Sequence, residues 1–267
     1  MPCYGNKTRS SLMHAPGAIL ITGASGGIGK ALAETYASPG AVLFLGGRNA
    51  ARLQSVADAA ASRGAEVHTK ILDVTDRDAM ALWISEAHAT APLDLVIANA
   101  GISAGTGDGG PEPADQVRRV YAVNVDGVMN TVLPALPLMQ ERGKGQIGIV
   151  SSLAGFRGFP GAPAYCGSKA AVKVFGEGLR PTAARSGIEV SVICPGYVRS
   201  PMTDVNDFPM PFLMDADKAA KIIRRGLERN KARIAFPWPM HAMVILLQAL
   251  PPSWIDGIMG RLPTKSG

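Results

Sequence analysis

Tyr165 and Lys169 are the side chains whose types and spacing point most directly to chemistry. They stand four residues apart, so on a helix they would share one face, one turn from each other. A free tyrosine has a pKa of about 10 and is a poor acid–base group at neutral pH. Because a nearby ammonium favours the phenolate, we expect Lys169 to lower the pKa of Tyr165. An isolated pair at this spacing could equally be an ordinary exposed pair on a helix.

A hydroxyl group upstream of this pair would complete a proton-transfer site. Ser152 follows an apolar run and could hydrogen-bond a substrate oxygen beside the Tyr165 hydroxyl, with Ser151 as the competing serine. Cys166 has no His or acid at a recognisable partner position, so we interpret it as a small buried residue rather than a nucleophile. The histidines show no spacing typical of metal ligands, and we expect no metal.

A glycine-rich turn, Thr22–Gly29, lies between an apolar run and a stretch of helical spacing. Glycines in such a turn let backbone N–H groups approach a pyrophosphate, and a helix N-terminus favours its negative charge. The spacing Gly-x-x-x-Gly-x-Gly differs from the usual Gly-x-Gly-x-x-Gly fingerprint. Taken alone, the turn is as compatible with tight packing as with dinucleotide binding.

The chain alternates short apolar runs with stretches of helical spacing, which is typical of a parallel sheet covered by helices on both faces. We therefore predict an α/β fold with a doubly wound parallel sheet in a single domain. Pro134, Pro137 and Pro181 fall inside predicted helices, which we expect to bend or break there. The predicted strands are Ala18–Thr22, Ala41–Leu45, Glu66–Leu72, Leu93–Ala98, Gln146–Ser151 and Glu189–Cys194, and the predicted helices are 30–37, 50–63, 77–89, 114–142, 162–186 and 215–233.

Further motifs follow the glycine turn in a fixed order. They are Ala98–Gly101 after the fourth predicted strand, then Asn124, Ser152, Tyr165 with Lys169, and Pro195-Gly196 after the sixth. In this order, over about residues 17–203, the chain resembles the short-chain dehydrogenase/reductase (SDR) family. The resemblance implies a Rossmann fold of three αβα layers. It divides the single domain, 1–267, into an N-terminal extension (1–16), the sheet and its helices, a substrate-covering loop and helix (201–235) and an apolar C-terminal tail (236–267).

The resemblance also implies a role for each polar residue of the predicted site. Ser152 would hold the substrate oxygen, and Tyr165 would exchange a proton with it. Lys169 would bind the nicotinamide ribose, while Asn124 would orient Lys169 through water and extend a proton relay. The residues implied to contact the cofactor are Gly23, Ser25, Gly26, Gly27, Ile28, Gly29, Arg48, Asp73, Val74, Asn99, Ala100, Gly101, Tyr165, Lys169, Pro195, Gly196, Val198 and Ser200.

The residues after the second predicted strand favour NADP (NADPH) over NAD. An NAD enzyme generally places a carboxylate there to bind the ribose hydroxyls, but no acid stands between Glu34 and Asp58. Arg48 instead stands where NADP-preferring members of the family often carry a basic residue, which can pair with the 2′-phosphate. Gly26 departs from relatives with a second basic residue in the glycine turn. A solvated surface arginine is the alternative for Arg48.

The loop after Ser200 carries large apolar side chains between prolines, and in the family this segment covers the substrate. An apolar, methionine-rich cover suits a lipid-like, steroid-like or aromatic carbonyl compound better than a charged sugar. Packing of these residues on the core is an equally good interpretation. The residues concerned are Met202, Phe208, Met210, Phe212, Leu213 and Met214.

The positive charge of the chain is local. The net charge is +6 and the pI about 9.4, yet residues 218–233 alone hold seven basic residues and one acid. We therefore expect no nucleic-acid partner. The basic helix could be a solvated face, or it could dock with the apolar tail on an anionic membrane surface. The tail could equally complete a dimer interface or wall the substrate pocket.

Together these features predict an NADP(H)-dependent oxidoreductase that interconverts a carbonyl and an alcohol by hydride transfer on an apolar substrate. Isomerase or dehydratase chemistry on the same fold is one alternative. A cofactor-binding, membrane-associated protein with little turnover is the other. The few, unclustered cysteines and the lack of a recognisable targeting segment favour the cytoplasm, with peripheral membrane contact as a hypothesis. By resemblance, we expect a homodimer or homotetramer.

Overall fold

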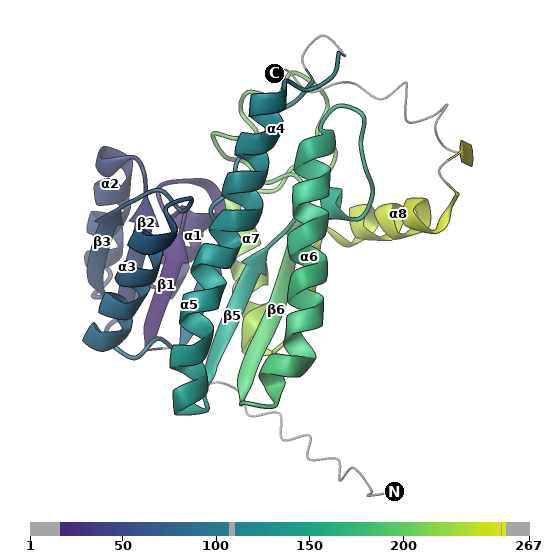
Figure 1. Ribbon diagram of the computed structural model, residues 1–267. Coiled ribbons are helices and arrows are strands. Elements are labelled where there is room, and N and C mark those ends of the chain that lie inside the picture. Colours follow the sequence, from purple (N-terminus) through teal and green to yellow (C-terminus); the bar gives the residue numbers. More distant parts are fainter. Residues whose placement is uncertain (1–16, 107–109, 252, 255–267) are drawn as a thin grey trace, which may run out of the picture.

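The centre of the molecule is one sheet of seven parallel strands (Figure 1). The computed structural model describes residues 17–106, 110–251 and 253–254. Its strand order, β3-β2-β1-β4-β5-β6-β7, runs outward from the centre in two directions, so the sheet is doubly wound. The strands are β1 (Ala18–Thr22), β2 (Val42–Gly47), β3 (Glu66–Ile71), β4 (Leu95–Ala98), β5 (Gly145–Val150), β6 (Ile188–Pro195) and β7 (Arg233–Phe236).

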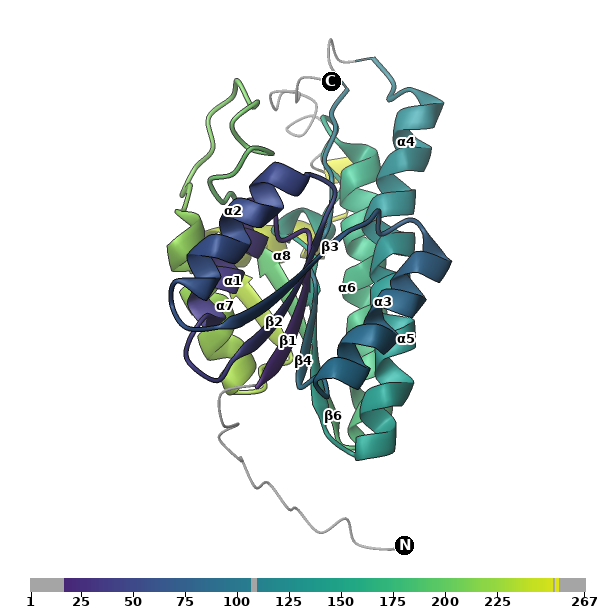
Figure 2. The same ribbon diagram turned by 90° about the vertical axis from the view of Figure 1, so that its left-hand side faces the viewer.

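Helices cover both faces of the sheet and make the three predicted layers (Figure 2). One face carries α1, α2 and α7, whose Leu32 and Ile223 share a hydrophobic cluster. The other carries α3, α5 and α6, whose Met80 and Val172 share a second cluster. The helices are α1 (Gly27–Tyr36), α2 (Ala50–Ala61), α3 (Arg77–Thr90), α4 (Ala114–Tyr121), α5 (Gly127–Arg142), α6 (Pro163–Ala184), α7 (Ala216–Glu228) and α8 (Trp238–Ala249), with a π-helical turn, Ala122–Asp126, joining α4 to α5 and a short 3₁₀ helix at Leu153–Gly155.

The composition of the strands follows from these layers. Every residue of β1, β4 and β5 is buried, because a parallel sheet with helices on both sides offers no solvated face. The edge strand β3 is accessible along its length and is correspondingly more polar. The predicted fold class is confirmed.

The strand β7 is absent from the predicted set, which places its first residue at the end of a helix and its last in the tail. In the structure α7 ends at Glu228, and a turn through Asn230, with φ of 45°, brings the chain beside β6. The four residues of β7 are too few to show the alternation by which a strand is recognised. The six-strand prediction is therefore one strand short.

Prolines do not break the helices that contain them. Helix α5 is continuous through Pro134 and Pro137, and α6 continues through Pro181, so neither helix breaks there, while a bend stays a prediction. Val132 and Met139 on α5 are buried against the sheet, and this packing outweighs the hydrogen bonds that proline cannot make.

Helix α8 extends from the end of β7 away from the sheet (Figure 1). It carries no charged residue, and its Trp238 and Leu246 side chains are exposed. No helix within the described residues is long and apolar enough to cross a membrane.

Replacing Ile97 with Ala is expected to lower the free energy of unfolding by about 2–5 kcal/mol, because the side chain is fully buried in the central strand β4. Ile71→Ala makes the same chemical change on the edge strand β3, where the side chain is 53% exposed, and should stay within about 0.5 kcal/mol of the wild type. Urea unfolding followed by circular dichroism measures both. Equal losses at the two positions would contradict the central place of β4.

Candidate active site

A cavity of about 1250 Å³ lies at the carboxyl ends of the strands, the edge where ligands bind in open α/β sheets. It runs from the glycine turn after β1 to the apolar side chains of α8. All the predicted site residues line it except Gly29 and Asn124, which lie behind Gly23 and Gly101 of its wall. The residues that the sequence predicts to form the site therefore lie together around one cavity.

The glycine turn is as close to its neighbours as the backbone permits. Gly23 has φ of 66°, and a Cβ there would lie 2.8 Å from the Cα of Ala100. A Cβ on Gly29 would overlap the Gly23 carbonyl and come within 2.6 Å of the Asn99 amide. The first turn of α1 has no acidic residue and no side-chain cap, and its Gly27 and Ile28 line the cavity, so its backbone N–H groups are available to an anion there.

Hydrogen bonds fix the end of β4 to the end of β1. Thr22 Oγ1 accepts from the backbone N–H groups of Asn99 and Ala100, each at 3.1 Å. Asn99 Nδ2 donates to the carbonyls of Thr22 and Gly23 at 2.9 and 3.2 Å. These bonds fix the cavity wall after β1 relative to the wall after β4.

Arg48 lies at the cavity wall after β2, with its side chain 64% exposed. Its Nη1 is 3.6 Å from Asp73 Oδ2. Burial acts to raise the pKa of Asp73, but hydrogen bonds from Thr75 and the charge of Arg48 hold that pKa below its ordinary value. Arg52, in the first turn of α2, also lines the cavity. Arg52 is absent from the predicted cofactor contacts, although a second arginine four positions after Arg48 is a signal for the same site.

Tyr165 and Ser152 meet inside the cavity. The phenol lines the cavity and is enclosed by protein on its other sides, and this burial raises its pKa to about 12, while a hydrogen bond with Ser152 acts in the opposite direction. Ser152 Oγ also lies 3.4 Å from the Pro195 carbonyl and accepts from the Ala154 N–H at 3.1 Å. Ser151 Oγ instead donates to the Lys169 carbonyl at 2.7 Å, so it is engaged within the protein.

Lys169 is buried one turn along α6, with Nζ 5.9 Å from the centre of the Tyr165 ring. Its ammonium donates to the Val150 carbonyl at 3.0 Å, and burial lowers its pKa to about 8. In this structure burial of the phenol outweighs the effects that lower its pKa, and the lowering expected from Lys169 stays a prediction. At neutral pH the phenol therefore carries its proton.

Asn124 stands in the π-helical turn between α4 and α5. Its Oδ1 accepts from the Ile102 N–H at 2.8 Å, and its Nδ2 donates to the Ile102 carbonyl at 2.9 Å and to Ser168 Oγ at 3.0 Å. These bonds tie the loop after β4 to helix α6. The action of Asn124 on Lys169 through water stays a prediction, although a Cβ on Gly101 would lie 3.2 Å from both Asn124 Oδ1 and Lys169 Nζ, so the two side chains flank the same point.

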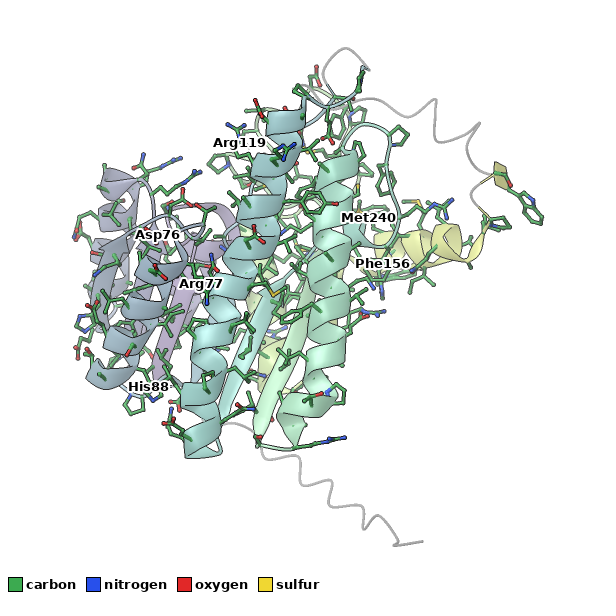
Figure 3. The ribbon with its side chains drawn as sticks, viewed as in Figure 1. Asp76, Arg77, His88, Arg119, Phe156 and Met240 are labelled. Carbon is green, nitrogen blue, oxygen red and sulfur yellow. The ribbon has the colours of Figure 1, made fainter. Side chains whose placement is uncertain are left out.

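The far half of the cavity is apolar. Of the side chains predicted to cover the substrate, Met202 and Phe208 line the cavity, whereas Phe212 is exposed and Met214 packs on the core. Met240, near the start of α8, lies close to Phe156 (Figure 3) and packs with it in a small cluster. The apolar lining side chains are Leu153, Phe159, Tyr197, Met202, Phe208, Met240, Met243, Val244 and Leu247. One of the alternatives for the tail, a wall of the pocket, therefore holds for α8.

Comparisons of the sequence agree with this geometry. A family model described as short chain dehydrogenase matches residues 17–208. An uncharacterised oxidoreductase of Myxococcus xanthus is 41% identical over 244 residues, which are 91% of this chain and 96% of that protein. An uncharacterised oxidoreductase of Mycobacterium tuberculosis is 33% identical over 239 residues, 88% of this chain and 94% of that protein.

Solved structures resemble the whole fold. A short-chain dehydrogenase from Sphingobium yanoikuyae in complex with NADPH has a TM-score of 0.77 and 26% identity, with 92% of this chain and 96% of that chain covered. A short-chain dehydrogenase/reductase from Burkholderia phymatum in complex with NAD has a TM-score of 0.78 at 24% identity, with 93% and 96% covered. At 24% identity, the similarity to the Burkholderia phymatum structure shows only that the folds are alike.

Gly29→Ala is expected to weaken NADPH binding by about 10-fold or more, because the new methyl group would displace the Gly23 carbonyl and reshape the turn. Gly178→Ala on α6 is the matched control, since a Cβ there meets nothing within 4 Å. Fluorescence titration with NADPH measures both. Unchanged binding in Gly29→Ala would contradict the assignment of this turn to the cofactor.

Proposed function

The chain belongs to the short-chain dehydrogenase/reductase family, and we propose from this that it interconverts a carbonyl and an alcohol with NADP(H) as cofactor. The observation that carries the proposal is the meeting of Ser152, Tyr165 and Lys169 in one cavity with the glycine turn. Members of the family are oxidoreductases that use nicotinamide cofactors, and Gly23, Gly26 and Gly27 line the cavity without side chains, which lets backbone N–H groups approach a pyrophosphate.

The cofactor, when bound, supplies or accepts the hydride. The turn after β1 and the N-terminus of α1 would hold its pyrophosphate, and Lys169 would bind the nicotinamide ribose. Arg48 and Arg52 support NADP rather than NAD, because two guanidinium groups, one just after β2 and one in the first turn of α2, can pair with a 2′-phosphate. The NADPH complex of the Sphingobium yanoikuyae relative supports the same choice.

The side chains of this protein would perform the proton transfer. Ser152 Oγ and the Tyr165 hydroxyl, which are hydrogen-bonded to each other, would both bind the substrate oxygen. In the reductive direction Tyr165 donates its proton to that oxygen as negative charge develops there. The raised pKa of about 12 suits this role, because the phenol is protonated over the whole neutral range. The buried ammonium of Lys169 stabilises the phenolate that remains.

The substrate side of the cavity supports an apolar carbonyl compound. Its lining is aliphatic, aromatic and rich in methionine, with Tyr197 contributing a hydroxyl near the reacting end. Methionine side chains adapt to irregular apolar shapes, so a lipid-like, steroid-like or aromatic ketone or aldehyde fits this lining better than a charged sugar does.

Tyr165→Phe should abolish turnover while NADPH binding survives, because the change removes the proton donor and leaves the ring in place. Tyr121→Phe on α4 makes the same change outside the cavity and should keep the wild-type rate. NADPH oxidation followed at 340 nm with a panel of apolar ketones and aldehydes measures turnover, and fluorescence measures binding. Near-normal turnover in Tyr165→Phe would refute the assigned role.

Arg48→Ala should raise the Kd for NADPH by about 10- to 100-fold and leave the Kd for NADH nearly unchanged, since only NADPH carries the 2′-phosphate. Arg185→Ala, an exposed arginine after α6, is the matched control and should alter neither. Titrations with both nucleotides measure the ratio. A parallel loss of affinity for NADPH and NADH would argue against a phosphate contact at Arg48.

A further inference from the structure

Tyr197 places a hydroxyl group in the otherwise apolar half of the cavity. It stands two residues after the end of β6 and lines the cavity together with methionine, leucine and phenylalanine side chains. Within the described part of the chain its hydroxyl has no hydrogen-bond partner, and the oxygen is not sealed inside the protein. The hydroxyl is therefore open to a molecule that enters the cavity.

The backbone around Tyr197 fixes the direction of its side chain. The Tyr197 carbonyl accepts a hydrogen bond from the Met214 N–H at 3.0 Å, and the next residue, Val198, pairs with Met214 in a parallel bridge. Val198 packs in the core, and successive side chains of an extended segment point to opposite faces, so Tyr197 points into the cavity. Its ring packs edge to face on Phe208 of the loop after Ser200, with the ring centroids 6.1 Å apart.

The Tyr197 hydroxyl also lies near the groups proposed to bind the reacting carbonyl. After burial and the bond with Ser152, the groups that act on the pKa of Tyr165 are Cys166 and Tyr197, so these side chains lie close together. Burial first, and Cys166 second, raise the pKa of Tyr197 above its ordinary value. The phenol of Tyr197 therefore keeps its proton at neutral pH and can donate a hydrogen bond.

A donor at this place discriminates between ligands of the same shape. A wholly apolar substrate would remove water from the Tyr197 hydroxyl and leave it without a partner. Such an unpaired donor weakens binding by about 10-fold or more, whereas a substrate oxygen at the same position would replace the lost hydrogen bond. The lining thus favours a substrate whose apolar body carries an oxygen beside Tyr197.

We propose that Tyr197 is a specificity-determining residue: its hydroxyl donates a hydrogen bond to a second oxygen of the substrate, while Ser152 and Tyr165 bind the oxygen of the reacting carbonyl. The substrate is then an apolar carbonyl compound with a hydroxyl or a second carbonyl near the reacting group, such as an aromatic hydroxy ketone or diketone. The proposal rests on the proposed function, in which Ser152 and Tyr165 hold that carbonyl.

Tyr197→Phe tests the hydroxyl, because it keeps the ring that packs on Phe208 and the backbone bond to Met214. Two pairs of ketones differ only by a hydroxyl in place of a methyl group: phenacyl alcohol with propiophenone, and β-hydroxypropiophenone with butyrophenone. In at least one pair, the ratio of kcat/KM for the hydroxy ketone to that for its methyl partner should fall about 10-fold in Tyr197→Phe. NADPH oxidation at 340 nm measures the ratio, and Tyr121→Phe, outside the cavity, should retain it.

Binding to the protein saturated with NADP⁺ gives a readout that does not depend on reduction, because the oxidised cofactor has no hydride to give to a ketone. Calorimetric titration with each ketone measures the Kd. In Tyr197→Phe the preference for the hydroxy ketone should fall by about the same 10-fold factor. A wild type that binds the hydroxy ketone preferentially but reduces neither ketone would refute the proposed function and leave the assignment of Tyr197 intact.

Three results would overturn the assignment of Tyr197. The first is a ratio in Tyr197→Phe equal to that of the wild type for both pairs. The second is a wild type that binds neither hydroxy ketone more tightly than its methyl partner, and this comparison decides alone if the variant does not fold. The third is a rise in the Kd for NADPH in Tyr197→Phe as large as the rise for the hydroxy ketone, since the hydroxyl would then bind the cofactor.

Discussion

The burial of Tyr165 and Lys169 is the constraint on which the site depends. Lys169 is buried and Tyr165 is partly buried in the cavity wall, and this removal from water moves the pKa of each toward the neutral form, to about 12 for the phenol and about 8 for the ammonium. A buried pair of this kind is tolerable only where partners are fixed, and here Ser152 and the Val150 carbonyl provide them. The sheet and helix α6 hold the Tyr165 phenol, the Lys169 ammonium, the Ser152 hydroxyl and the Val150 carbonyl close together.

Other elements of the fold form the rest of the cavity around these groups. The close approach of the β1 and β4 ends, secured by Thr22 and Asn99, opens the crevice at the edge where strand order reverses. The π-helical turn places Asn124 against the loop after β4 and against α6. Helix α8 closes the apolar end of the cavity with side chains that come from the last described part of the chain.

Local sequence signals predicted the parts that depend on local structure. The apolar strands, the glycine turn and the Tyr165–Lys169 spacing all follow from neighbouring residues, and they are found where the sequence indicates them. The parts that depend on distant partners were missed. The short strand β7 is defined only by pairing with β6, and the helical path through Pro134 depends on burial against the sheet. The pKa direction at Tyr165 likewise depends on enclosure, which no spacing reveals.

The most direct test of the account follows the hydride itself. NADPH with deuterium at both C4 positions would be incubated with the wild-type protein and an apolar ketone, and the alcohol product analysed by mass spectrometry. The account predicts one deuterium on the carbinol carbon and equivalent oxidation of the cofactor. An alcohol product without the label, or bound NADPH that reduces no member of a broad set of apolar ketones and aldehydes, would contradict it.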